Sequence, residues 1–250
     1  MELVLLTAVT VGGATILGAV IGFVFNGGVD ERWGNIILSF AAGIMLASSV
    51  LGLILPSLSY GTKYAFLVSV LGIFGGAFLI FSLDKLSVNS DLSVSQATVE
   101  KKQEKNSLKL FAVAIAIHNF PEGLAAGVGF GAGNTADALM IAGGIALQNI
   151  PEGMVIISPM IESGIKKGRA FLYAALTGVI EIVGTLLGYF AITVSYSVLP
   201  FILSFAGGTM LYVISDDIIP ATHTDRTERS ATFALLLGFC FMLAADYFLG

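Results

Sequence analysis

Apolar residues fill the chain in long runs, and short polar segments separate these runs. A helix needs about 20 apolar residues to cross the roughly 30 Å hydrocarbon core of a bilayer. Eight runs reach this length, so we predict eight transmembrane helices and an all-α, polytopic membrane protein with one integral membrane domain over residues 1–250. The predicted spans are 3–25, 34–58, 62–83, 108–131, 136–160, 169–191, 197–219 and 230–249.

The composition excludes several other classes of protein. Hydrophobic residues make up 56% of the chain, charged residues make up 12%, and the mean hydropathy is +0.92. Soluble proteins average about 25% charged residues. A net charge of −5 without a basic face argues against nucleic-acid binding. Cys240 is the single cysteine, which excludes a disulfide scaffold.

The basic residues predict the orientation in the membrane. With the N-terminus outside, Lys63 is the one basic residue in an outer segment, and the other eleven of the twelve Lys and Arg fall at inner segments. This bias follows the positive-inside rule, so we predict that both termini lie outside. The polar segment 84–107, rich in Ser, Lys, Glu and Gln, is predicted to be a flexible cytoplasmic loop between the third and fourth helices.

Internal matches predict an inverted repeat. The sequence LSFAAGIML at 38–46 resembles LSFAGGTML at 203–211, and TILG at 15–18 resembles TLLG at 185–188. The helices of each pair cross the predicted membrane in opposite directions. Inverted repeats of this kind place a binding site near the midplane. We therefore predict a 3+2+3 arrangement, in which helices 1–3 and 6–8 are related and the central pair forms a hairpin.

The central pair carries a polar motif twice. The sequence HNFPEG begins at His118 in the fourth span, and QNIPEG begins at Gln148 in the fifth. In each copy the first residue and the glutamate are four apart and share a helix face, which Asn119 or Asn149 borders. Pro121 and Pro151 are expected to open their helices locally, because proline lacks an N–H and displaces the carbonyl four residues earlier.

Carboxylates at membrane depth need a counter-charge. Glu122, Glu152 and Glu181 fall within spans four, five and six, and no Lys or Arg lies in the middle of these spans. A charged side chain there costs on the order of 3 kcal/mol on insertion scales. Either a bound cation or a proton must neutralise them. Imidazole, carboxylate and amide ligands suit a divalent first-row metal, and two facing carboxylates can bridge two metals.

Two other functions use the same residues. The glutamates can serve as a proton relay in a proton-coupled carrier of an organic solute, although no intramembrane Arg or Lys is available to hold an anionic substrate. A membrane-embedded di-metal enzyme is the other alternative. The chain lacks the HExxH motif and the ExxH pairs of di-iron bundles. We therefore predict a protein that is not an enzyme and has no cofactor or catalytic residue.

The eight spans and the two Pro-Glu motifs resemble the ZIP (Zrt/Irt-like) family of divalent-metal transporters, and the chain is most similar to its prokaryotic GufA-like branch. The resemblance covers the whole chain and implies a transporter that moves metal toward the cytoplasm. Zinc is the first expected substrate, with cadmium, iron and manganese as others. It also implies a prokaryotic cytoplasmic membrane, an elevator-like motion of one helix group and a homodimer.

The resemblance further implies a ligand set for a binuclear centre. The first metal would be bound by His118, Glu122, Gln148 and Glu152, with Met45 as a soft ligand. The second metal would share both glutamates as bridges and add Asn119, Asn149 and Glu181. Protonation of His118 is expected to weaken binding as the pH falls. Asp216, Asp217 and His223 resemble the family's exit route.

Overall fold

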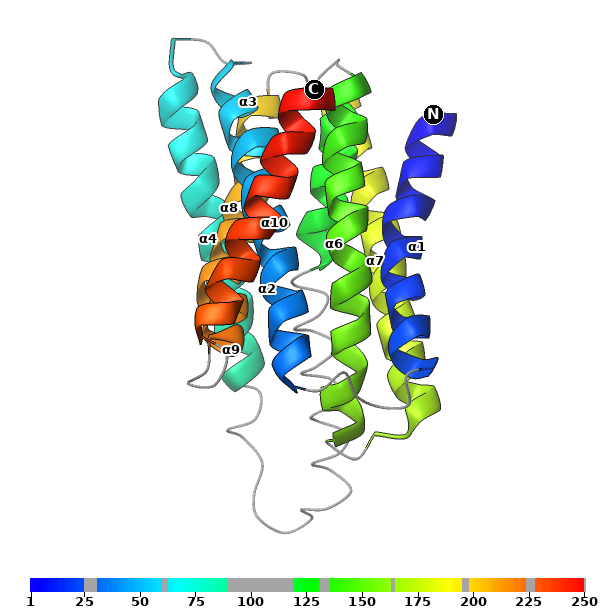
Figure 1. Cartoon of the computed structure of the whole chain (residues 1–250). Coiled ribbons are helices and arrows are strands. Elements are labelled where there is room, and N and C mark those ends of the chain that lie inside the picture. The colour runs from blue at the N-terminus through cyan, green and yellow to red at the C-terminus, as the bar shows by residue number, and fades with distance from the viewer. Residues whose placement is uncertain are drawn as a thin grey trace.

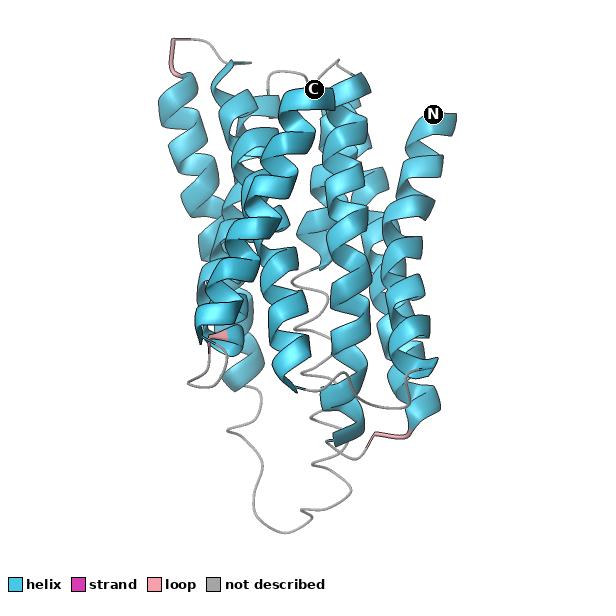
Figure 2. Ribbon diagram, in the orientation of Figure 1, coloured by secondary structure: helices cyan, strands magenta, loops and turns pink. Residues whose placement is uncertain are grey.

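The computed structural model is a bundle of helices that run along one common direction (Figure 1). It describes residues 1–24, 31–59, 63–89, 119–130, 135–162, 165–194, 198–223 and 228–249. Among these residues every regular element is a helix and none is a strand (Figure 2). The predicted all-α class is therefore confirmed. The start of α1 and the end of α10 lie at the same end of the bundle.

The helices follow the apolar runs closely. Their bounds are α1 Glu2–Val24, α2 Glu31–Ala47, η1 Ser48–Ile54, α3 Leu55–Ser59, α4 Ala65–Asn89, α6 Thr135–Glu162, α7 Lys167–Val194, α8 Leu199–Val213, η3 Ile214–Ile218, α9 Ile219–Thr222 and α10 Glu228–Leu249. Residues 119–130 form a further helix, called the 119–130 helix below. The elements η1 and η3 are π-helical, and each continues directly from the α-helix before it.

Within the described ranges, six helical stretches are long and apolar enough to cross a membrane. They are Glu2–Val24, Arg32–Ser59, Ala65–Leu83, Lys167–Ala191, Leu199–Thr222 and Arg229–Phe248. Each lies within a few residues of a predicted span. The predicted span 136–160 falls within α6, whose 28 residues include the polar motif. The predicted span 108–131 is described from residue 119 onward, and this part is helical.

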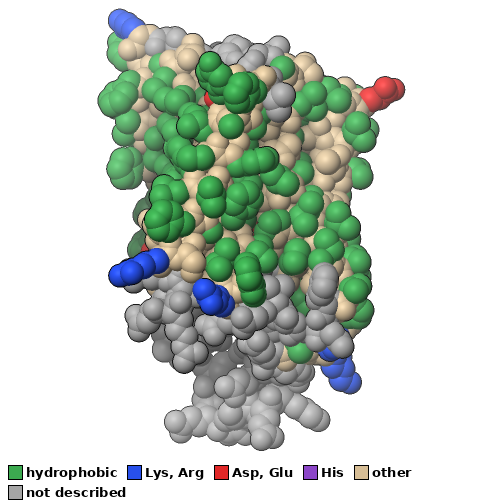
Figure 3. Space-filling model, viewed as in Figure 1, with side chains coloured by type: hydrophobic (Ala, Val, Ile, Leu, Met, Phe, Trp, Pro, Cys, Tyr) green, Lys and Arg blue, Asp and Glu red, His purple; other side chains and the backbone are tan. Residues whose placement is uncertain are grey.

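The surface of the bundle is apolar around its middle. Large hydrophobic side chains such as Phe74, Phe78 and Phe233 are about 70% exposed. On the face seen in Figure 3, apolar side chains cover the middle, and the coloured Lys and Arg side chains lie near the two ends. Exposed apolar surface on this scale is expected where lipid replaces water. The chain is therefore an integral membrane protein.

The third span is longer than its apolar run. The loop was predicted to begin at residue 84, but α4 continues to Asn89. A helix keeps its own backbone hydrogen bonds when it leaves the hydrocarbon, so polar residues can extend it into the interface. Lys85 is exposed, and its Nζ lies 6.0 Å from the centre of the Phe81 ring. The remainder of the predicted loop, 90–107, lies outside the described residues.

Glycine contacts divide the helices into two groups. A Cβ on Gly12 of α1 would lie 2.2 Å from the carbonyl oxygen of Gly178 of α7, and one on Gly153 of α6 would lie 2.3 Å from that of Thr15. A Cβ on Gly127 would lie 2.0 Å from the carbonyl oxygen of a residue in α7. Such contacts require glycine because the backbones touch. We call α1, the 119–130 helix, α6 and α7 the motif group.

The other helices pack in the same way among themselves. A Cβ on Gly43 of α2 would lie 2.0 Å from the carbonyl oxygen of Leu235 of α10, and one on Gly208 of α8 would lie 2.3 Å from that of Ile73 of α4. We call α2, η1, α3, α4, α8, η3, α9 and α10 the frame group. Between the groups the close glycine contacts are with side chains: Gly52 faces Ile141, and Gly144 faces Met242.

The helix irregularities lie elsewhere than predicted. We expected Pro151 to open its helix, but α6 is α-helical throughout. The π turns instead occur in η1 and η3, just before Pro56 and Pro220. Each of these prolines crowds the carbonyl four residues earlier, at Gly52 or Asp216, and both carbonyls lie inside the π segments. A wider π turn relieves that crowding, and such turns are frequent at functional sites.

Candidate metal site

The motif residues of three neighbouring helices are buried together in the motif group. Asn119, Asn149, Glu122 and Glu181 are 0% exposed and Gln148 is 1% exposed. The 119–130 helix supplies the first asparagine and Glu122, α6 supplies the glutamine and the second asparagine, and α7 supplies Glu181. Residues this polar are seldom fully buried unless they have polar partners or bind an ion.

The remaining predicted ligands differ in their placement. Met45 of α2 is 3% exposed and packs in the same apolar cluster as Ala125, Ala142 and Ile145 of the motif group. Glu152 of α6 is partly buried. His118 lies outside the described residues. The predicted role of His118 therefore stays a prediction.

One hydrogen bond joins the two copies of the repeated motif. Gln148 donates from Nε2 to Oε1 of Glu122 over 2.8 Å, so the first residue of the motif in α6 meets the glutamate of the motif in the 119–130 helix. The glutamine nitrogen must face the carboxylate, because an ionised carboxylate only accepts hydrogen bonds. Its oxygen consequently points away from Glu122.

A second network surrounds Glu181. Thr15 of α1 donates to Oε1 over 2.6 Å, and Asn119 donates to the same oxygen. Asn149 donates to Oε2 over 2.6 Å. Thr185 binds the backbone oxygen of Glu181 rather than its carboxylate, over 2.9 Å. Four helices are thus tied together through one side chain.

Four oxygen atoms in these networks are buried and accept no hydrogen bond from any part of the chain that the structure describes. They are Oδ1 of Asn119, Oε2 of Glu122, Oε1 of Gln148 and Oδ1 of Asn149. A buried polar atom without a partner costs on the order of 1–3 kcal/mol. All four atoms are acceptors, so a cation satisfies them where a further acceptor cannot. Carboxylate and amide oxygens are suitable ligands for divalent metals.

Side-chain type limits which metals these atoms attract. Within the described ranges no three His, Cys, Asp or Glu side chains gather closely enough to hold an ion. Amide oxygens therefore make up much of the described donor set.

Sequence reasoning overlooked Thr15 as a partner of Glu181, although its match with Thr185 in the repeated TILG and TLLG sequences was a signal.

The predicted exit residues lie at or near α9, which is at the opposite end of the bundle from α3 (Figure 1). Asp216 and Asp217 are in η3, and His223 follows α9. Asp216 is exposed and His223 is partly buried. His223 Nδ1 lies 3.0 Å from the carbonyl oxygen of Ile219. When Nδ1 carries the proton and donates to this carbonyl, Nε2 keeps the lone pair. These three residues do not form a metal-holding cluster among the described residues.

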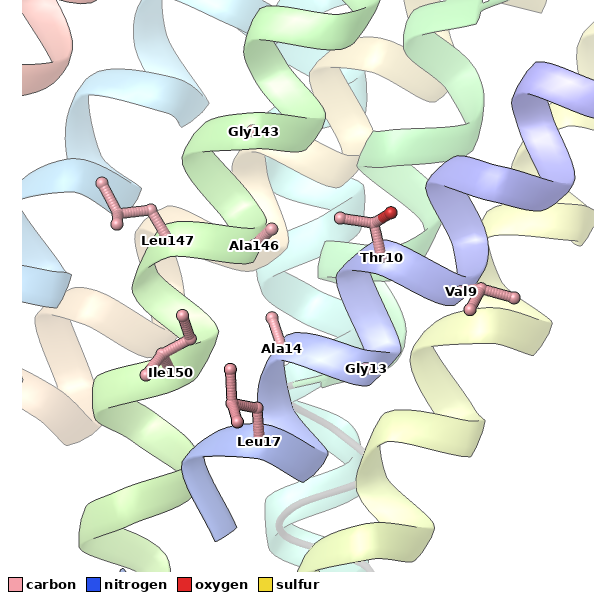
Figure 4. Close-up of a pocket in the computed structure, with 9 residues that line it drawn as sticks. All are labelled: Val9, Thr10, Gly13, Ala14, Leu17, Gly143, Ala146, Leu147 and Ile150. Carbon is pink, nitrogen blue, oxygen red and sulfur yellow. The ribbon is translucent and has the colours of Figure 1, made fainter. Parts of the chain in front are cut away.

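A groove between α1 and α6 is separate in character from this polar site. It measures about 420 Å³, and its walls include Val9, Leu17, Leu147 and Ile150 (Figure 4). Its lining is almost wholly apolar, and Val9 and Leu17 are at least half exposed. The groove opens outward and offers little to a cation.

Comparison with known proteins shows to which family the chain belongs. The family model described as ZIP zinc transporter matches residues 85–246, which include both Pro-Glu motifs and Glu181. The chain belongs to the ZIP zinc transporter family. The resemblance noted from the motifs is thus confirmed, and the organic-solute alternative finds no support among the matches.

Individual members of the ZIP family match most of the chain. The zinc transporter ZIPB of Bordetella bronchiseptica is 34% identical over 95% of this chain and 78% of its own length. The zinc transporter ZIP11 of Xenopus tropicalis is 30% identical over 95% of this chain and 94% of its own. The zinc transporter GufA of Myxococcus xanthus is 44% identical, but the match spans 58% of this chain and only 57% of the relative.

Proposed function

We propose that the chain transports a divalent transition metal, with zinc as its first substrate, across a membrane toward the cytoplasm. The observation that carries this proposal is the set of four buried oxygens without hydrogen-bond partners on the repeated motifs. Relatives that align along almost the whole chain are named zinc transporters. Cadmium, iron and manganese are further substrates compatible with these ligand types.

The ligands that we propose begin with the two motif glutamates. Glu122 and Glu152 supply the charge, Gln148 and His118 supply an oxygen and a nitrogen, and Met45 supplies a soft sulfur. What supports this choice is the hydrogen bond between the two motifs and the burial of Met45 against the same group of helices. Asn119, Asn149 and Glu181 complete the polar surroundings.

We also propose eight spans in the inverted 3+2+3 arrangement. Eight crossings would consist of the six apolar helices, α6 and the span to which the 119–130 helix belongs, and an even number agrees with the two chain ends at one end of the bundle. The glycine contacts support the inverted relation. Gly18 of α1 presses on α6, and its repeat partner Gly188 of α7 presses on the 119–130 helix. The π turns η1 and η3 likewise fall at matching repeat positions.

The two helix groups suggest how an ion moves. Each group is locked internally by backbone contacts at glycine, whereas the closest glycine contacts between the groups involve side chains at Gly52 and Gly144. Sliding of packed helices past one another is a known mode of conformational change. We therefore propose that the motif group carries the ion past the frame group in an elevator-like motion. Asp216, Asp217 and His223 would receive the ion on the cytoplasmic side.

The rest of the assignment follows the family. The chain is proposed to act in a prokaryotic cytoplasmic membrane as a homodimer, with both termini outside. It is proposed to be a transporter and not an enzyme, since the matching relatives are named transporters. Its metal is a substrate rather than a cofactor.

Uptake into liposomes tests this proposal. The purified chain is reconstituted in vesicles that hold a metal-sensitive dye, and zinc, cadmium, manganese and iron(II) are added separately. The intact chain should transport zinc, and Glu122→Ala should abolish uptake because it removes charge from the buried site. Glu2→Ala, which removes an exposed carboxylate at the start of α1, is the matched control and should transport normally. Normal uptake by Glu122→Ala would refute the site.

A further inference from the structure

The two buried carboxylates of the motif group have different hydrogen-bond surroundings. Glu122 accepts one hydrogen bond, and its second oxygen is free among the described residues. Glu181 accepts three, from Thr15 and Asn119 on one oxygen and from Asn149 on the other. Glu122 thus keeps an oxygen for a ligand, whereas each oxygen of Glu181 already accepts at least one hydrogen bond.

The donors around Glu181 oppose direct metal binding by this residue. An N–H or O–H that donates to a carboxylate oxygen takes one of its lone pairs and places a partial positive charge where a cation would approach. A cation bound directly to Glu181 would lie against the N–H groups of Asn119 and Asn149, which carry partial positive charge. The present arrangement avoids this conflict. The amide nitrogens of Asn119 and Asn149 are held on Glu181, and their Oδ1 atoms are left without a partner.

Charge balance favours one ion over two. Three carboxylates, of Glu122, Glu152 and Glu181, fall within spans four, five and six, and no Lys or Arg lies in the middle of these spans. One divalent ion balances the charges of the two motif glutamates, and three hydrogen bonds stabilise the charge of Glu181. Two divalent ions would bring four positive charges against three negative ones. The excess positive charge would lie in a low-dielectric interior, where it is costly.

We infer that Glu181 is a positioning residue that holds the amides of Asn119 and Asn149 with their oxygens toward a single divalent ion. This inference rests on the proposed function and narrows it, because the family resemblance implied two metals with Glu181 as a ligand of the second. Groups that orient metal ligands from behind are a recurrent feature of metal sites, and their loss costs about 10–100-fold in affinity. Thr15 supports the same orientation from α1.

Ion counting tests the inference directly. The full-length protein in detergent is dialysed to equilibrium against cadmium or zinc, and bound metal per chain is measured by mass spectrometry of the element. We expect one ion per chain for the unmodified protein and one for Glu181→Gln. The glutamine keeps the shape of the side chain, but its amide N–H groups face those of Asn149, so that asparagine must turn its oxygen away from the ion.

The variants also separate positioning from general stability. Glu181→Gln should bind the ion about 10–100-fold more weakly, and bound cobalt(II) should show an altered absorption spectrum as the amide oxygens leave. Thr15→Val removes a donor to the carboxylate and should weaken binding. Thr185→Val removes an equally buried hydroxyl that contacts only the backbone of Glu181, and it should leave the affinity unchanged.

The possible results are distinct. Two ions on the unmodified chain and one on Glu181→Gln would make Glu181 a ligand and overturn the inference. Unchanged affinity and an unchanged cobalt spectrum in Glu181→Gln would overturn it as well. If this variant does not fold, the comparison of Thr15→Val with Thr185→Val decides, and equal affinities overturn the inference. An unmodified chain that binds no ion would refute the proposed function itself.

Discussion

Gly153 fixes the distance between the helix that carries Glu152 and its neighbour α1. A Cβ at this position would lie 2.3 Å from the carbonyl oxygen of Thr15, whereas ordinary contact begins at 3.4 Å. Both atoms belong to rigid backbone, so Gly153→Ala must move α6 away from α1 by about 1 Å. Overpacking of this kind costs about 1–3 kcal/mol. The shift also carries Glu152 away from its place, so ion affinity should fall with stability.

Two substitutions on the same helix are matched controls. A Cβ at Gly143 meets nothing within 4 Å, and one at Gly144 meets the flexible end of Met242 at 2.8 Å. Gly143→Ala should be neutral, and Gly144→Ala should cost less than Gly153→Ala because a methionine side chain can move aside. Thermal unfolding in detergent gives the stabilities, and calorimetric titration with zinc gives the affinities. Equal stability of Gly143→Ala and Gly153→Ala would refute the packing argument.

Three further predictions concern individual side chains. Gln148→Ala removes the hydrogen bond to Glu122 and a ligand oxygen, so zinc affinity in a titration should fall by about tenfold or more; an unchanged affinity would contradict the assignment. Asn149→Asp adds a fourth carboxylate and should raise the ion count in equilibrium dialysis to two; a count that stays at one would contradict the charge argument. Ser69→Ala removes the 2.7 Å hydrogen bond to Ser57 between α3 and α4. It should lower the free energy of unfolding by about 0.6 kcal/mol without changing zinc affinity, and a change in affinity would contradict the separation of the two helix groups.

Much of the fold was predictable from local sequence. Every apolar run that the structure describes as a long helix was placed within a few residues, because length and hydropathy alone decide which segments suit a bilayer. The face that Gln148 and Glu122 share with their motif partners also followed from helical spacing. That their side chains meet across two helices was implied by the family resemblance, and the hydrogen bond agrees with this.

Other features depended on contacts between distant segments. Glu181 was identified as a buried charge, but Thr15, its partner, is 166 positions away in the chain. The expected opening at Pro151 did not occur, whereas π turns formed before Pro56 and Pro220. A proline disturbs every helix by the same local mechanism, and whether the helix bulges depends on what packs around it.

The sequence by itself therefore determined that the chain is a helical membrane protein with polar residues in the middle of its central helices. It did so because hydropathy and helical periodicity are properties of neighbouring residues. Only the tertiary structure decided which oxygens are occupied and which are free. The amides of Asn119 and Asn149 point their nitrogens at Glu181 because α1, the 119–130 helix and α6 all meet α7 at this carboxylate. No local pattern contains that information, because it arises when the helices pack.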